Sequence, residues 1–244
     1  MKRFLLLTLT LIAVGCSEPI PRNLEELVWQ GDDYRFRGVY LDRETVRPYS
    51  GPVFDFFPDD TTRFRTIGSL KDGKWDGLYE DYWANGQLWE KGTYKDGEKD
   101  GLWESYHENG QLEERVTHKD EVPDGPTEGY YDNGQLRTKG TYRDGELDGL
   151  VENYYENGQL QAKTSHFYPD STEGRSDYGD RKSLRSDYGD ELPWWIHGPF
   201  EIYSEDGVLF EKGTMNMGEP CGEWFENGKT VTYDPCPPGL EDGN

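Results

Sequence analysis

The chain has 244 residues, of which 49 are acidic and 26 basic, so its formal net charge is −23. Nucleic acids and anionic lipid headgroups need basic surfaces, and this charge makes both poor partners. A basic protein partner fits the charge better. Acidic side chains that simply solvate an open sheet are an equally good explanation.

The first residues read as a secretion signal that ends at a lipid attachment site. Two basic residues precede an apolar run over 4–12, which is too short to span a bilayer, and three small residues, 13–15, precede Cys16. We predict a signal peptide over residues 1–15 and lipid attachment at Cys16. The alternative is an ordinary cleaved signal with an incidental cysteine.

Membrane attachment is expected through this lipid anchor only. By resemblance to Gram-negative lipoproteins, Ser17 after the cysteine favours the outer membrane, facing the periplasm, if the source is Gram-negative. We therefore expect a lipid-anchored protein of the cell envelope. Residues 16–27 read as a tether and residues 28–50 as an N-terminal capping strand region.

A repeated Asn-Gly dipeptide organises most of the chain. It recurs every 24 residues, at Asn85-Gly86, Asn109-Gly110, Asn133-Gly134 and Asn157-Gly158. Asn-Gly between alternating polar and aromatic residues predicts a tight β-hairpin in which both central residues have positive φ. The constant period predicts an all-β fold, an elongated antiparallel sheet of tandem hairpin repeats of about 24 residues.

The repeats also predict the boundaries of the array. They run over residues 51–172, where the first copy has a looser turn at Asp59-Asp60, and they resume over 198–234. Residues 173–197 are a degenerate or inserted segment, and residues 235–244 are a tail.

A two-residue turn fixes which residues face each other across a hairpin. With the turn at Asn-Gly, a glutamate faces a base in every copy: Glu80/Lys91, Glu104/Arg115, Glu128/Lys139, Glu152/Lys163 and Glu201/Lys212. Facing opposite charges stabilise paired strands by roughly 0.2–1 kcal/mol each, which supports this register. The register also sets Tyr79 opposite Gly92 and Phe200 opposite Gly213, where a ring fills the space that the missing side chain leaves.

Alternation along the strands assigns two faces to the sheet. The face expected to be buried carries aromatic residues such as Tyr79 and Trp103. It is also expected to carry five leucines: Leu88, Leu112, Leu136, Leu160 and Leu209. The opposite face carries the Glu–base pairs and a recurring tyrosine: Tyr82, Tyr106, Tyr130, Tyr154 and Tyr203.

These five tyrosines are the main candidate contacts for a partner. Rigid tyrosines give a large contact area at low entropic cost. The alternative is a purely structural ladder along the sheet. Trp194 and Trp195 interrupt the period, and an insertion in a regular array often carries function, so both are further candidates.

The copies share the pattern G-x-W/Y-E-x-Y-x-x-N-G-Q-L-x-x-K-G-x-Y-x-D-G. This pattern resembles the bacterial variant of the MORN repeat over about residues 51–234. The resemblance implies an elongated antiparallel sheet used for interaction or scaffolding. Similar bacterial proteins are often labelled antitoxin or immunity components.

Cys221 and Cys236 flank the last hairpin turn. In an oxidising envelope we expect a disulfide between them, which would stabilise the end of the array by about 3 kcal/mol. Two free thiols in a tail are the alternative.

The sequence offers no catalytic constellation. The four histidines, His107, His118, His166 and His197, lie in different copies without metal-ligand spacing, and His107 stands where sibling copies carry an aromatic residue. Nucleophile, phosphate-loop and zinc-protease motifs are missing. We expect no catalytic, metal or cofactor site and no enzyme.

The leading hypothesis is a non-enzymatic, membrane-anchored repeat protein that acts as a protein-binding scaffold in the cell envelope. The alternative is an antitoxin or immunity protein that neutralises a secreted toxin. The sequence does not name the partner.

Overall fold

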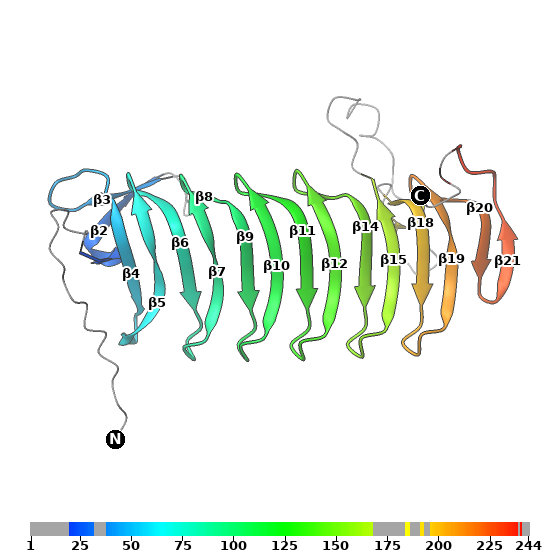
Figure 1. Ribbon diagram of the computed structural model, residues 1–244, viewed down its shortest axis with the longest axis horizontal. Helices are drawn as coiled ribbons and strands as arrows, with labels where there is room; N and C mark the ends of the chain where they lie inside the picture. Colours follow the sequence, from blue (N-terminus) through cyan, green and yellow to red (C-terminus); the bar gives the residue numbers. More distant parts are fainter. Residues whose placement is uncertain are drawn as a thin grey trace, which may run out of the picture.

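The computed structural model describes residues 20–31, 38–167, 196–238 and 240, and the backbone of 184–185 and 191–192. These residues form one sheet of 17 strands, two small two-stranded sheets and one 3-10 turn, η1 (Leu24–Glu26). Figure 1 shows the hairpins side by side along the long axis of the molecule, with the strands lying across that axis. The predicted all-β fold, an elongated sheet of tandem hairpins, is confirmed.

The strands follow each other in chain order. They are β1 (Arg22–Asn23), β2 (Leu27–Gln30), β3 (Val39–Asp42), β4 (Gly51–Phe57), β5 (Asp60–Lys71), β6 (Lys74–Tyr82), β7 (Leu88–Lys95), β8 (Glu98–Lys99), β9 (Gly101–Tyr106), β10 (Leu112–Lys119), β11 (Val122–Tyr130), β12 (Leu136–Arg143), β13 (Glu146–Leu147), β14 (Gly149–Tyr154), β15 (Leu160–His166), β16 (Leu184–Arg185), β17 (Glu191–Leu192), β18 (Ile196–Tyr203), β19 (Leu209–Asn216), β20 (Glu219–Glu226) and β21 (Lys229–Thr232). From β4 to β21 the long sheet is antiparallel, and β1 adds to β4 in parallel. The pairs β2–β3 and β16–β17 form the two small sheets.

The predicted register across the hairpins is confirmed, because all five glutamates face their predicted base. The turn that produces this register differs from the predicted one. Trp83 N donates to Gln87 O and Gly86 N donates to Trp83 O, both at 2.8 Å. The loop therefore spans 84–86, and only Gly86 in it has a positive φ, +85°.

A β-bulge compensates for the longer loop. The register shifts by one residue between the pair Asp81–Glu90 and the pair Tyr82–Leu88. The longer loop shifts the strand register by one residue, and the bulge shifts it back. The register expected for a two-residue turn therefore holds in the body of the hairpin.

The same bulge places the leucines on the charged face. Leu88 pairs with Tyr82, and paired residues of antiparallel strands share a face. The other four leucines repeat this pairing with Tyr106, Tyr130, Tyr154 and Tyr203. The prediction that the leucines lie on the buried face is therefore wrong.

Two-residue turns with positive φ at both residues do occur, mainly at the opposite ends of the strands. They are Asp72-Gly73, Asp96-Gly97, Asp120-Glu121, Asp144-Gly145 and Met217-Gly218, together with Asn227-Gly228 in the last hairpin. All of these turns except Asn227-Gly228 lead one hairpin into the next. In the first copy Phe57 pairs with Asp60, so the turn is Pro58-Asp59 and not Asp59-Asp60.

We call the face that carries Tyr79 and Trp103 the inner face, and the face that carries the Glu–base pairs the outer face. At the N-terminal end of the inner face four rings form a chain of edge-to-face contacts, Trp75 with Tyr79, Tyr79 with Tyr94 and Tyr94 with Trp103, and neighbouring ring centroids lie 4.8–5.2 Å apart. All four side chains are at most 7% exposed. This aromatic part of the predicted buried face is confirmed.

The inner face carries smaller side chains in the middle of the array. Thr127 and Val151 occupy the position of Tyr79 and Trp103, and both are buried. Larger side chains return at the C-terminal end, where Ile196, Phe200, Met215 and Trp224 form a second core cluster.

Aromatic rings also cover the glycines of the inner face. A Cβ at Gly92 would lie 2.3 Å from the ring of Trp103, and a Cβ at Gly213 would lie 2.3 Å from the ring of Trp224. The ring nearest to each glycine therefore comes from the following hairpin and not from the facing residue. This packing joins one hairpin to the next.

The N-terminal end is capped by the chain before the first hairpin. Arg22 pairs with Val53 in the parallel β1–β4 ladder, and Leu27 is 5% exposed within the N-terminal core. The part of the predicted tether from Arg22 onward therefore belongs to the folded sheet, because its apolar side chains cover the end of the core.

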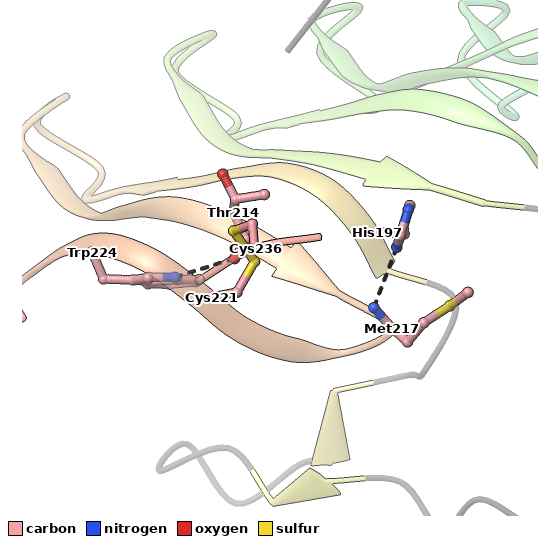
Figure 2. The surroundings of a disulfide bond; sticks show 6 residues. All are labelled: His197, Thr214, Met217, Cys221, Trp224 and Cys236. Atoms are coloured by element: carbon pink, nitrogen blue, oxygen red, sulfur yellow. Dashed lines mark hydrogen bonds between the residues drawn. A yellow bond between two sulfur atoms is a disulfide. The ribbon is translucent and has the colours of Figure 1, made fainter. Parts of the chain in front are cut away.

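The C-terminal end is closed by a disulfide. Cys221 and Cys236 are joined at an S–S distance of 2.07 Å, beside Trp224, whose Nε1 donates to Thr214 O at 3.2 Å (Figure 2). Gly222 N donates to Asp234 O at 2.8 Å, so the chain after β21 remains paired with β20 as far as the disulfide.

Candidate interaction surface

The outer face carries an unbroken ladder of alternating charges. The base of each hairpin pairs in register with the glutamate of the next hairpin: Lys91–Glu104, Arg115–Glu128, Lys139–Glu152 and Lys163–Glu201. Ion pairs form in both directions, since Glu104 accepts from Lys91 and from Arg115, each at 2.9 Å. The ladder holds five acids and five bases and is therefore neutral.

Each recurring tyrosine is fixed by the glutamate two residues earlier in its strand. The hydroxyls of Tyr82, Tyr106, Tyr130, Tyr154 and Tyr203 donate to Glu80, Glu104, Glu128, Glu152 and Glu201 at 2.6–2.9 Å. All five tyrosines are half-buried. The structure thus brings these predicted contact residues together in one row, with the leucines between them.

Glu104 keeps its charge, and Tyr82 its proton, over a wide pH range. A hydrogen bond from Lys91 holds the pKa of Glu104 at about 2, with Arg115 and Tyr106 acting in the same direction against burial. Burial, and then the bond to Glu80, raises the pKa of Tyr82 to about 12. Near neutral pH Glu104 is therefore ionised and Tyr82 is protonated.

Exposed leucines border the other side of the ladder. Leu78, Leu102 and Leu150 stand two residues before the ladder glutamates of their strands, so they share the outer face. They are 76%, 49% and 45% exposed. The outer face therefore combines a neutral polar centre with apolar rows on both sides.

The loops that carry Asn-Gly form a second, acidic row along one edge of the sheet. Each asparagine side chain donates to a backbone carbonyl in the next loop, at Glu108, Asp132, Glu156 and Glu205, over 2.7–3.2 Å. The side chains of these four acidic residues are exposed. Negative charge therefore accumulates along this loop edge while the ladder stays neutral.

A further chain of hydrogen bonds joins the hairpins and was not anticipated from the sequence. Trp83 Nε1 donates to Tyr106 O at 2.8 Å, and the hydroxyls of Tyr131 and Tyr155 bond in the same way to the carbonyls of Tyr154 and Tyr203. The recurrence of a polar aromatic residue two positions before each Asn-Gly was the available signal.

His107 belongs to this chain of bonds. Its Nε2 lies 3.2 Å from Tyr130 O, so the ring nitrogen donates the proton. His107 therefore takes the place of the tryptophan or tyrosine of sibling copies. His118 and His166 are half-buried on the inner face, and no partner of their Nδ1 atoms is found among the described residues.

The remaining sites predicted from the sequence lie outside the described residues. They are Cys16, Trp194 and Trp195. In the described part of the chain no group of three or more His, Cys, Asp or Glu side chains is placed to hold a metal ion. The same part has no helix long and apolar enough to cross a membrane.

The hairpins that carry this surface match a known repeat family. Residues 75–96, 99–120, 123–144, 147–168 and 196–217 each fit the model of the MORN repeat variant. Five segments of the chain are thus similar to the MORN repeat variant. The matched segments carry the ladder from Glu80 to Lys212. A comparison with curated proteins gave no match.

Each of the five matched segments contributes the same set of side chains to the outer face. The first hairpin, β4–β5, and the last, β20–β21, lie outside the matched segments, and neither contributes a Glu–base pair to the ladder. The repeated surface is thus a property of the five matched segments and ends where they end.

Proposed function

We propose that this chain is a non-enzymatic repeat scaffold, held at a cell-envelope membrane by lipid on Cys16, which binds another protein on its outer face. The observation that carries the proposal is the fivefold repetition of one internally bonded group, a tyrosine on a glutamate that is paired with a base. A scaffold needs such a repeated, preorganised surface.

The chemistry of the outer face suits a protein partner. The tyrosines are already fixed by hydrogen bonds, so little side-chain entropy is lost when a partner covers them. The neutral ladder avoids the repulsion that a field of like charges would impose. The acidic loop edge beside it favours a partner with basic residues at its rim, where charge speeds association.

The proposal is tested by capture from solubilised membranes with the lipidated chain as bait. We expect the double variant Tyr106→Ala/Tyr130→Ala to lose the captured protein. The matched control is Tyr142→Ala, which removes a half-buried tyrosine of the inner face from β12 and should retain the partner. Unchanged capture by the outer-face variant would exclude the tyrosine row as the binding site.

An antitoxin or immunity role is the second candidate, and the acidic loop edge supports it. In that case the captured protein is a basic secreted toxin, and adding the purified chain suppresses its toxicity. A captured protein without toxicity favours the scaffold.

A further inference from the structure

The first hairpin carries an aromatic patch where the later hairpins carry the charge ladder. Phe54, Phe56 and Phe64 lie with ring centroids 5.0–5.6 Å apart. Phe54 pairs with Ile67, which pairs with Glu80, so the patch lies on the outer face in line with the ladder. Phe64 is 45% exposed. We call Phe54, Phe56, Phe64 and Ile67 the phenylalanine patch.

The charged groups around the phenylalanine patch are paired. Arg63 Nε lies 2.6 Å from Asp60, and its guanidinium lies 5.3 Å from the centroid of the Phe57 ring. Arg65 is bonded to Asp55, which alternates with Phe54 and Phe56 and is buried on the inner side of β4. The patch therefore has an apolar centre with a paired arginine at its edge.

Strand β1, which begins six residues after Cys16, lies beside β4, the strand that carries Phe54 and Phe56. Six residue steps separate Cys16 from Arg22, a reach of at most about 20 Å. Strand β1 then pairs with β4 so that Asn23 faces Phe54. A lipid on Cys16 is consequently confined to the neighbourhood of the phenylalanine patch, and it cannot reach the distant end of the sheet shown in Figure 1.

The distribution of charge favours the same end of the molecule. Residues 20–71 contain eight basic and nine acidic side chains, whereas residues 72–244 contain 16 basic and 39 acidic side chains. The large negative charge therefore lies after the first hairpin. A membrane surface repels the repeats and tolerates the first hairpin.

We propose that the phenylalanine patch docks on the lipid surface to which Cys16 is anchored. This inference rests on the proposed lipid anchor but concerns a different surface, upstream of the five matched repeats. The docked rings give the chain a second attachment to the bilayer and keep the first hairpin against it. The outer face of the repeats is thereby held in a fixed position relative to the membrane.

The test uses the full mature chain coupled through Cys16 to a maleimide lipid, in vesicles of phosphatidylethanolamine and phosphatidylglycerol. Cys16 is the one free thiol when Cys221 and Cys236 are bonded to each other. The vesicles contain a phospholipid with a diazirine in its acyl chain, and mass spectrometry locates the label after illumination. We expect the label in β4 and β5.

Two serine variants give the matched comparison. Phe64→Ser should reduce the label in β4 and β5 several-fold, whereas Phe167→Ser, which removes a phenylalanine that is 38% exposed after β15, should leave it unchanged. Label absent from β4 and β5, or unchanged by Phe64→Ser, overturns the docking. The natural anchor is tested separately by the intact mass of Cys16 from native membranes, so its failure is distinguishable.

Discussion

The N-terminal hairpins and the middle hairpins share one backbone pattern but fill the inner face differently. Between β5 and β9 the inner face is a stack of buried rings around Tyr94 and Trp103. Between β11 and β15 the corresponding side chains include Thr127 and Val151. The outer ladder and the loop bonds continue unchanged through both regions. Strand pairing and the bonds between loops therefore maintain the array where the inner face adds little.

The largest effect should come from removing the ring that joins two N-terminal hairpins. Trp103→Ala deletes the cover of Gly92 and the contact with Lys99, whose Nζ lies 3.8 Å from the ring centroid. We expect a loss of about 3–5 kcal/mol in the free energy of unfolding. The matched variant Val151→Ala removes two methyl groups and should cost about 1–2 kcal/mol. Urea unfolding of both variants measures the difference, and equal losses would contradict the contrast between the regions.

Removal of the disulfide should act on the C-terminal end alone. Cys221→Ser/Cys236→Ser opens a loop of sequence separation 15, and about 3 kcal/mol of local stability should be lost. Repeats interact chiefly with their neighbours, so the loss should be confined to β20 and β21. Hydrogen exchange resolved by strand measures this. Faster exchange in β6 and β7 would show that the array unfolds as a single unit.

Two glycines give a smaller and more local comparison. Gly92→Ala places a Cβ 2.3 Å from the Trp103 ring and should destabilise the chain by about 1–3 kcal/mol. Gly140→Ala in the middle region meets Val151 at 3.2 Å, where a small shift of the side chain suffices, and should change stability by less than about 0.5 kcal/mol. Thermal unfolding of the two variants checks the prediction, and a reversed order would show that the ring does not fill the space over Gly92.

Acid should produce the smallest of these effects, a loss of stability at β10 and β15. Burial lowers the pKa of His118 and His166 from 6.5, so their neutral forms are favoured in the folded chain. Because the unfolded chain then binds more protons, the free energy of unfolding falls as pH drops below about 6.5. The equivalent residue of the N-terminal region is Tyr94, and its hydroxyl stays protonated in this pH range.

The variant His118→Tyr, which introduces the residue found at this position in sibling copies, should flatten the pH dependence. Unfolding measured at pH 7.5 and 5.5 tests this. An identical pH dependence in the variant and in the natural chain would exclude His118 as a source.

The sequence was sufficient to predict the repeat, the register and the pairs from Glu80/Lys91 to Glu201/Lys212. It misplaced the leucines, because a one-residue bulge inverts the face of Leu88 and leaves no mark in the periodic pattern. The bonds between neighbouring hairpins, such as Trp83 to Tyr106 O, depend on how far one hairpin is displaced from the next. The residue pattern within one copy does not determine that displacement.

The start of the N-terminal cap, residues 22–27, was missed for a different reason. Residues 22–27 contain few apolar side chains and no repeat signal, so a tether was the simpler interpretation. Leu27 becomes buried only because the first hairpin leaves Val53 and Tyr79 uncovered at the end of the array. Which segment covers that end is set by tertiary packing and not by local sequence.

The most direct test of the account compares two tyrosines of one hairpin, Tyr130 on the outer face and Tyr142 on the inner face. Each is replaced in turn by a photoreactive phenylalanine analogue in the lipid-anchored chain, and the cells are illuminated before analysis. We predict a protein crosslink from position 130 and none from position 142. A crosslink from position 142 alone would contradict the outer face as the binding surface.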